Sequence, residues 1–167
     1  MDPLALFKIP FTGLKAGKHE FQMDVDQEFF TNFPESEIED AKGVVDVVLE
    51  YSETNMVLYL EMNLTWKVPC GRCLEELTYD LNREERIAVQ YGEETIIGDD
   101  LWTLGKNEIE LDLSSTILEM SHIARPTHQV HENESDCDPD MIALINNDSE
   151  EESENPIDPR WDALKNL

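Results

Sequence analysis

Two cysteines stand at the ends of the tetrapeptide Cys70-Gly-Arg-Cys73, and this C-x-x-C spacing suits two thiolates on one metal ion. A tetrahedral zinc site needs two further ligands, which Cys137 together with His131 or His128 can supply. We therefore expect a zinc site formed by Cys70, Cys73, Cys137 and His131 that holds the tail to the sheet. Two alternatives stay open, because packed or exposed thiols at a strand turn and a redox dithiol would show the same spacing.

Chemistry of other kinds has no support in the sequence. The Walker A, G-x-S-x-G, H-E-x-x-H and G-x-G-x-x-G patterns are absent. The chain has 38 Asp and Glu residues, so the choice of any two of them as an acid–base pair carries no information. We expect a binding protein and not an enzyme, with zinc as the candidate cofactor.

Charge is the dominant feature of the composition. The 38 acids stand against 12 Lys and Arg, which gives a net charge of −26. Nucleic-acid binding draws most of its non-specific affinity from Lys and Arg, so extensive contact with RNA or DNA is disfavoured. Long-range attraction favours a basic partner, although acidity that only keeps a small protein soluble is the plainer alternative.

A few basic residues lie close together in the sequence near the C-x-x-C motif. They are Lys67, Arg72, Arg83 and Arg86. If they cluster in space, they form a local patch that contacts RNA directly. The alternative is that Arg83 and Arg86 pair with the acids beside them.

The odd number of cysteines is a poor basis for a disulfide framework and fits a reducing compartment. No stretch approaches the roughly 20 apolar residues that a membrane span needs. The first residues lack the basic and apolar regions of a signal peptide. We expect a cytoplasmic protein with no membrane contact.

Period-two alternation is the strongest structural pattern in the sequence. Apolar residues alternate with polar ones over 45–51 and again over 56–68, on either side of a short turn, which predicts a long hairpin. A third strand is predicted over 74–91, with a change of phase and a bulge near 82–86. Shorter strands are predicted over 4–11, 18–25 and 101–111.

Helical signals are fewer. A helical turn is predicted over 27–33. Asp112 is a candidate N-cap for a helix that the Arg125-Pro126 pair ends. These elements predict an α+β fold, a strongly twisted antiparallel sheet that is either open or closing toward a barrel, with two or three packed helices.

The sequence divides into a sheet-plus-helix domain over 1–125, an acidic, partly disordered tail over 126–157 and a short C-terminal helix over 158–167. Within the tail, Asp138-Pro139 predicts a helix start, and the acidic run over 146–155 predicts disorder. The last helix places Trp161 and Leu164 on one face, and a helix this short is unstable unless that face docks. We therefore include both residues among the candidate binding residues.

Three motifs occur in a recognisable order. They are Val68-Pro-Cys-Gly-Arg-Cys-Leu74, the helix opening Glu110-Leu-Asp-Leu113, and the ending Asp158-Pro-Arg-Trp-Asp-Ala-Leu-Lys-Asn-Leu167. Together they resemble the YceD family, the large ribosomal RNA subunit accumulation proteins of bacteria and plastids. The resemblance covers most of the chain and implies a role in producing or stabilising large-subunit ribosomal RNA, with no established reaction.

The same resemblance implies a second cysteine cluster between the helix and the ending. Here only Cys137 stands in that region, preceded by His128 and His131, so the implied site becomes a cysteine–histidine variant. Charge and resemblance together predict that the partner is a basic large-subunit ribosomal protein or a pre-ribosomal particle. Direct ribosomal RNA binding, or an acidic interaction protein unrelated to ribosomes, are the alternatives.

Overall fold

A computed structural model of the chain describes residues 3–152, with side chains up to residue 147. The chain forms two compact units, which we describe separately. The sheet unit contains the chain up to Val68 together with Thr78–Thr127, and the cysteine unit contains Pro69–Leu77 and the chain from His128.

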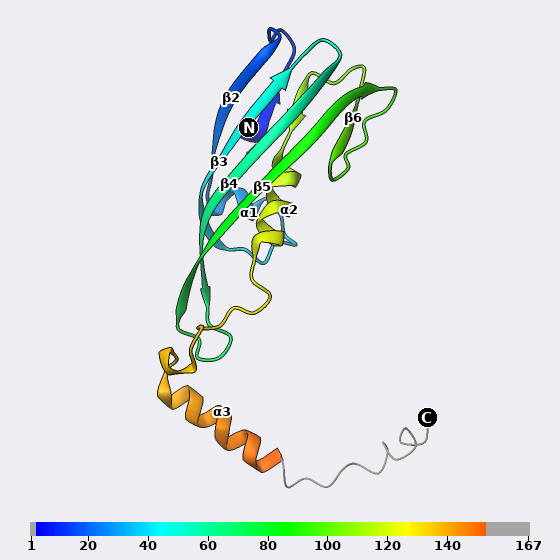
Figure 1. Cartoon of the computed structure of the whole chain (residues 1–167). Coiled ribbons are helices and arrows are strands. Elements are labelled where there is room, and N and C mark those ends of the chain that lie inside the picture. The colour runs from blue at the N-terminus through cyan, green and yellow to red at the C-terminus, as the bar shows by residue number, and fades with distance from the viewer. Residues whose placement is uncertain (1–2, 153–167) are drawn as a thin grey trace, which may run out of the picture. The chain divides into compact units, whose positions relative to one another are not determined.

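The sheet unit is built on five strands in the order β2, β3, β4, β5 and β6 (Figure 1). The α+β prediction is confirmed. The sheet is open, with β2 and β6 at its two edges, and β6 pairs with β5 in parallel, so the sheet is not wholly antiparallel. The strands are β2 (Gly17–Val25), β3 (Asp40–Tyr51), β4 (Asn55–Pro69), β5 (Glu76–Gly92) and β6 (Leu101–Gly105).

The predicted long hairpin is formed by β3 and β4. Their antiparallel register runs from Tyr51 opposite Met56 to Asp40 opposite Lys67. The backbone N–H of Ser52 donates to the carbonyl oxygen of Asn55 at 3.0 Å and closes the turn. Alternate side chains of both strands are fully buried, as a half-buried strand requires.

Strand β5 corrects one expectation, because the predicted change of phase does not occur. Leu81, Ile87 and Val89 are all buried, and every odd-numbered position faces the same side of the strand. Arg83 and Glu85 occupy two of these positions as an ion pair, with Arg83 Nε donating to Glu85 Oε1 at 2.8 Å. Because these two inward positions hold charged residues, the alternation of apolar and polar residues is interrupted in the sequence, although the strand keeps its phase.

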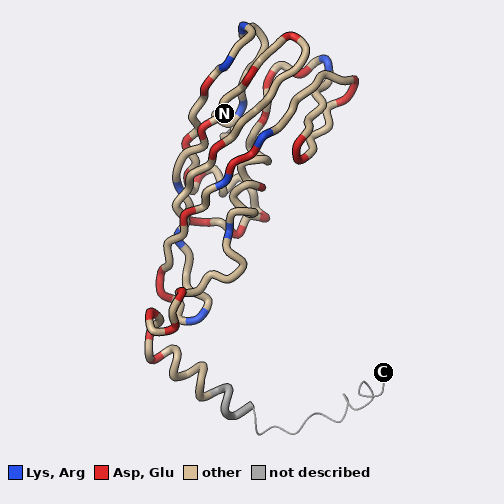
Figure 2. The backbone as a smooth tube through the Cα atoms, viewed as in Figure 1, with Lys and Arg blue, Asp and Glu red and all other residues tan. Residues whose placement is uncertain are grey.

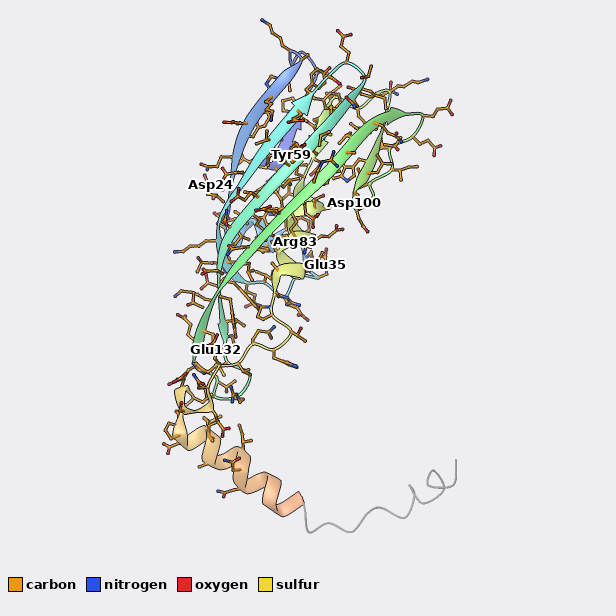
Figure 3. All side chains as sticks on the ribbon, viewed as in Figure 1. Asp24, Glu35, Tyr59, Arg83, Asp100 and Glu132 are labelled. Carbon is orange, nitrogen blue, oxygen red and sulfur yellow. The ribbon has the colours of Figure 1, made fainter. Side chains whose placement is uncertain are left out.

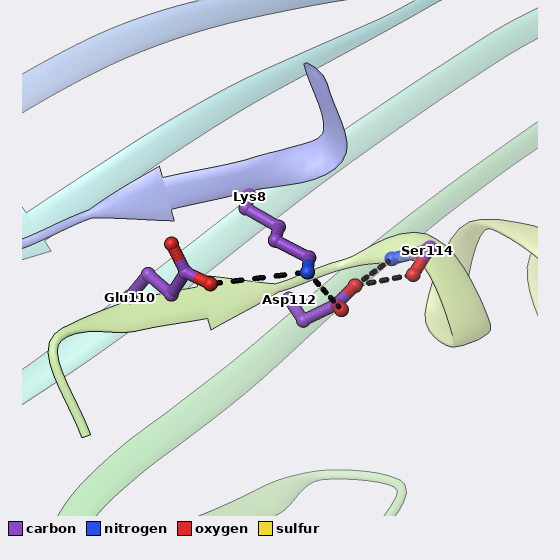
Figure 4. Close-up of polar contacts among 4 residues, drawn as sticks. All are labelled: Lys8, Glu110, Asp112 and Ser114. Carbon is purple, nitrogen blue, oxygen red and sulfur yellow. Dashed lines mark hydrogen bonds and ion pairs between the residues drawn. The ribbon is translucent and has the colours of Figure 1, made fainter. Parts of the chain in front are cut away.

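A second, two-stranded sheet joins distant parts of the sequence. Strand β1 (Lys8–Pro10) pairs antiparallel with β7 (Glu110–Asp112). Lys8 Nζ lies 3.9 Å from a carboxylate oxygen of Glu110 and 3.8 Å from one of Asp112 (Figure 4). The strand predicted over 4–11 is shorter than expected, because Ala5–Phe7 form a 3-10 turn, η1.

Helices α1 (Gln27–Thr31) and α2 (Ser114–Ala124) lie on one side of the five-stranded sheet (Figure 1). Asp26 caps α1, because its Oδ1 accepts the backbone N–H of Glu28 at 2.9 Å. At the start of α2 the N-cap position is occupied by Leu113 and not by the predicted Asp112. Asp112 stands one residue earlier, where its carboxylate accepts the N–H of Ser114 at 3.0 Å (Figure 4). Helix α2 ends before Pro126, because the residue preceding a proline disfavours helical backbone.

One apolar core unites these elements. It contains aromatic side chains from the N-terminal turn and α1, alternate residues of all five strands and the inner face of α2. Burial of this apolar surface stabilises the sheet unit. Its most deeply buried large side chains are Ile9, Ile38, Leu49, Met56, Leu58, Leu60, Met62, Leu64, Leu81, Ile87, Trp102 and Leu111.

The cysteine unit contains the loop between β4 and β5, a 3-10 turn η2 (Glu134–Asp136) and helix α3 (Pro139–Glu152). Helix α3 reaches Glu152 and so enters the run over 146–155 for which disorder is predicted. Asp138 Oδ1 accepts the N–H of Asp140 at 2.8 Å and starts the helix, which the favourable helix propensity of glutamate then extends. The predicted helix over 158–167 lies outside the described residues. None of the described helices is long and apolar enough to cross a membrane.

Candidate metal centre

The loop that carries the C-x-x-C motif is a tight turn closed by its own backbone. The N–H of Cys70 donates to the carbonyl oxygen of Glu75 at 2.7 Å, and the N–H of Leu74 donates to that of Cys70 at 2.9 Å. Leu74 closes the turn in the left-handed region, at a φ of 64°. The turn directs both cysteine side chains inward, where they are buried.

A second segment reaches this turn from a distant part of the sequence. The N–H of Gly71 donates to the carbonyl oxygen of Gln129 at 2.7 Å, which fixes the chain just before His131. Cys137 follows η2 and is also buried, its N–H donating to the carbonyl oxygen of Glu134 at 3.1 Å. Two local hydrogen-bonded structures thus place three thiols and one imidazole together.

The four predicted metal ligands form one cluster. One ligand atom from each of Cys70, Cys73, His131 and Cys137 lies within 4.8 Å of all the others. His131 Nδ1 lies 3.5 Å from Cys73 Sγ and 3.4 Å from Cys137 Sγ. Tetrahedral zinc with its usual bond lengths separates a sulfur and a nitrogen ligand by about 3.6 Å. The donor set and these distances therefore fit a Cys₃His zinc centre, and His128, which is exposed, is not part of it.

Arg72 connects the two halves of the cluster. Its backbone N–H lies 3.4 Å from Cys70 Sγ, and its guanidinium Nη2 donates to the carbonyl oxygen of His131. Its Nε is buried and has no hydrogen-bond partner within the described residues. Zn²⁺ bound by three thiolates and a neutral imidazole carries one net negative charge, which the Arg72 guanidinium balances.

The thiols of the cluster differ in acidity. Burial acts to raise the pKa of Cys70, but hydrogen bonds from the backbone of Cys73, Arg72 and His131 prevail and lower it to about 6. Burial raises the pKa of Cys137 to about 11, and the neighbouring Cys73 and Cys70 thiols add to this effect. Of these two thiols, Cys70 would lose its proton to a metal more readily, and a bound metal would have to displace the proton of Cys137.

Burial also bears on the redox alternative. Cys70 is 0% exposed, and Cys73 and Cys137 are 5% and 4% exposed. Thiol–disulfide exchange requires access for an attacking or leaving sulfur, so these exposures disfavour a redox dithiol. The cysteines pack instead against Leu77, Val130, Met141 and Ile142, which exclude water as the surroundings of a structural metal do.

Among the described residues, the candidate binding residues Arg83 and Arg86 do not share one surface. Arg83 and Arg86 lie on opposite sides of β5, as their odd and even positions require. Arg83 pairs with Glu85, and the Arg86 guanidinium lies 5.8 Å from the ring centroid of Tyr59. Trp161 and Leu164 fall outside the described residues.

Sequence reasoning missed the surroundings of Arg86. On the exposed side of β4, Tyr59 stands among Val57, Glu61 and Asn63, and it is 38% exposed (Figure 3). An aromatic residue in the polar phase of an alternating strand is the signal that could have identified this surface.

The protein thus combines an α+β unit, which contains an open five-stranded sheet, with a second unit that contains a cluster of three cysteines and one histidine. A family model described as "Large ribosomal RNA subunit accumulation protein YceD" matches residues 58–167, which include most of β4, the C-x-x-C turn and the rest of the cluster. The match covers most of the chain, and the chain belongs to the YceD family. No curated protein and no solved structure matches it.

Family membership assigns the protein to large ribosomal RNA accumulation. The family description names no reaction. It agrees with the resemblance drawn from the three sequence motifs, two of which, the C-x-x-C turn and the start of α2, are present in the described residues.

Proposed function

We propose that the protein is an accessory factor in large ribosomal subunit assembly, and that it acts by binding a basic ribosomal protein or a pre-ribosomal particle. The observation that carries this proposal is the charge. The chain has a net charge of −26, and carboxylates are distributed over all strands of the five-stranded sheet except β6 (Figure 2). Such a surface attracts basic proteins over a long range and speeds their association.

Direct binding of ribosomal RNA is the weaker candidate. It needs Arg83 and Arg86 on one surface, but they point to opposite sides of β5, and Arg83 is held by Glu85. Phosphates that approach Arg86 also meet the carboxylates of Glu61 and Glu84. A polyanion gains little from isolated bases in an acidic surface.

Within this function, we propose that Cys70, Cys73, His131 and Cys137 bind one Zn²⁺ ion with a structural role. Bound zinc supplies crosslinking and no reaction, because all four ligand positions are filled by the protein. The ligands come from the C-x-x-C turn and from the chain after His128, so the metal would join the two segments of the cysteine unit.

The assembly role is tested by isolating the tagged full-length chain from native lysate at low salt and at about 0.5 M salt, where charge attraction between exposed groups is largely screened. We expect large-subunit ribosomal proteins or precursor particles at low salt and their loss at high salt. Ribosomal RNA without ribosomal protein would favour direct RNA binding. If ribosomal components are absent at both salt concentrations, the assembly role is wrong and the protein is an acidic interaction protein of another kind.

A further inference from the structure

The five-stranded sheet has one face that the helices α1 and α2 do not cover (Figure 1). Leu58 and Leu60 of β4 point into the core, so the alternate residues Tyr59 and Glu61 point to the opposite side, where both are exposed (Figure 3 labels Tyr59). In the middle of this face, β3, β4 and β5 form a hollow of about 410 Å³. Its lining includes Asp46, Val48, Tyr59, Glu61, Glu84 and Arg86.

The rim of this hollow concentrates negative charge. Asp46 on β3 lies directly opposite Glu61 on β4 in the antiparallel register, and Glu84 lines the same hollow from β5. Like charges on directly opposite residues destabilise a sheet. The side-chain amide of Gln22 donates to Asp46 at 2.7 Å, and that of Asn63 donates to Glu61 at 3.3 Å. Amides are neutral, so these hydrogen bonds leave the negative charge in place. A cation in the hollow would relieve the repulsion.

The floor of the hollow suits a guanidinium group. Tyr59 lies opposite Val48 in the register, so an aromatic ring and an aliphatic side chain form an apolar pair next to the Asp46–Glu61 pair. The chain already places a guanidinium there, because Arg86 lies over the Tyr59 ring at 5.8 Å from its centroid. An aromatic ring and carboxylates that line one hollow offer a cation–π contact and charge-assisted hydrogen bonds, and arginine uses both.

We propose that this hollow binds an arginine side chain in an extended segment of a basic partner protein, and that Arg86 is the internal occupant which the partner's arginine displaces. The inference deepens the proposed function, on which it rests for the kind of partner. Arg86 is thus a competitor for the hollow and not a contact for a phosphate. Removal of Arg86 must then tighten the binding of an arginine-rich segment, whereas removal of a contact residue would weaken it.

The test uses the purified full-length chain and a fluorescently labelled peptide of alternating arginine and glycine, with fluorescence anisotropy as the readout. Tyr59→Ala should weaken binding about two- to fivefold, as expected for loss of an exposed cation–π contact. Tyr59→Phe keeps the ring and should bind like the wild type, which separates the ring contact from an effect on folding. Glu61→Gln with Glu84→Gln should weaken binding about two- to tenfold.

Matched controls separate the hollow from the general acidity of the chain. Glu53→Gln with Glu94→Gln removes the same charge from two exposed turns, and Lys106→Ala removes the same base as Arg86→Ala from another exposed turn. We expect Arg86→Ala to tighten binding more than Lys106→Ala does. Equal losses for the two glutamine pairs, or weaker binding for Arg86→Ala than for Lys106→Ala, would overturn the proposal.

This experiment contains no ribosomal component, so it is independent of the assembly role. Hollow-dependent peptide binding together with an empty isolation from lysate would leave the hollow as a site and refute the ribosomal function. Recovery of ribosomal proteins without any effect of Tyr59→Ala or Arg86→Ala on peptide binding would do the reverse.

Discussion

The sheet unit and the cysteine unit are built on different kinds of core. In the sheet unit, a continuous apolar cluster joins both helices to every strand of the large sheet. In the cysteine unit, the core consists of Cys70, Cys73 and Cys137 with a few partly buried apolar neighbours. The first core is stabilised by the large apolar area that it removes from water. The second core brings together side chains that can bind a metal ion.

This difference indicates that the two units obtain their stability from different sources. Small structures with little apolar surface to bury usually need a disulfide or a metal as a crosslink. The three cysteines are free thiols, so the crosslink available to the cysteine unit is a metal. The sheet unit should therefore fold without metal, and the cysteine unit should depend on it.

The largest expected effect follows from removal of zinc. The purified chain should contain about one zinc per molecule, because the four candidate ligand atoms form one cluster and zinc takes four ligands. A strong chelator should abolish the hydrogen-exchange protection of residues 69–77 and 128–147, since structural zinc binding contributes on the order of 10 kcal/mol to folding. Protection of β3 and β4 should remain. Peptide-resolved hydrogen exchange measures both regions in one experiment.

The two neighbouring histidines provide a matched control for this result. His131 lies in the cluster, and His128 is exposed outside it. His131→Ala should reproduce the effect of the chelator, and His128→Ala should keep both zinc and protection. Fewer than about 0.2 zinc per chain in protein never exposed to chelator would contradict a four-ligand site.

The next effect should appear only in the sheet unit. Leu58 is fully buried in the apolar core, and Leu58→Ala should lower the free energy of unfolding by about 2–5 kcal/mol because it leaves a cavity. Urea unfolding followed by the fluorescence of the buried Trp66 and Trp102 measures this loss. Zinc content should not change.

The neighbouring position on the same strand is the control. Val57 lies on the other face of β4 and is only partly buried, so Val57→Ala should cost much less than Leu58→Ala. Release of zinc from folded Leu58→Ala protein would mean that the two cores are not independent, which would remove the distinction between the units.

Much of the sheet unit could be predicted from the sequence, because period-two alternation directly reports which face of a strand is buried. The β3–β4 hairpin and the C-terminal end of α2 follow from local signals, whereas the N-cap of α2 is Leu113 and not Asp112. Strand β5 shows where this reasoning fails. Arg83 and Glu85 point inward as a pair, and only the fold can show that a charged residue at an inward position has a partner.

The ligand cluster could be predicted as a set but not as a geometry. The C-x-x-C spacing identified two ligands, and scarcity of other cysteines and histidines identified the remaining two. The choice of His131 over His128 depends on the backbone contact between Gly71 and Gln129, which no local pattern encodes. The hydrogen bond from Arg72 to the carbonyl of His131 is likewise a contact between distant residues.

A smaller effect tests how Arg72 supports the cluster. Arg72→Gln removes the guanidinium hydrogen bond to the His131 carbonyl and the positive charge that would balance the single net negative charge of a zinc-bound site. Zinc affinity should fall about 10- to 100-fold, as for other groups that position metal ligands. Competition with a chromogenic chelator measures the affinity. Arg72→Lys keeps the charge without the planar fork and should lie between Arg72→Gln and the wild type.

Arg83 is the control for Arg72, because its guanidinium pairs with Glu85 in the sheet unit. Arg83→Gln removes the same charge from the chain and should leave zinc affinity unchanged. An equal loss of affinity in both variants would show that the total charge, and not the contact with His131, determines how tightly the metal is held.

The smallest effect concerns acid, to which the two units should respond for different reasons. Burial lowers the pKa of His122 below 6.5, and the nearby Arg125 adds to this shift, while Glu37 and Glu35 oppose it. The Nε2 atom of His122 lies 3.2 Å from Ser36 Oγ. The unfolded chain therefore binds more protons than the folded one just below pH 6.5, so the sheet unit loses stability as the pH falls through this value. In His122→Gln, the midpoint of urea unfolding should therefore change less between about pH 7.5 and about pH 5.5 than in the wild type. Hydrogen exchange of β3 and β4 measures this unfolding of the sheet unit.

In the cysteine unit, protons compete with zinc for the ligand side chains. The acid-induced loss of hydrogen-exchange protection in this unit should therefore be the same in His122→Gln and the wild type. An identical pH response of β3 and β4 in both proteins would instead assign the acid sensitivity of the sheet unit to its many carboxylates.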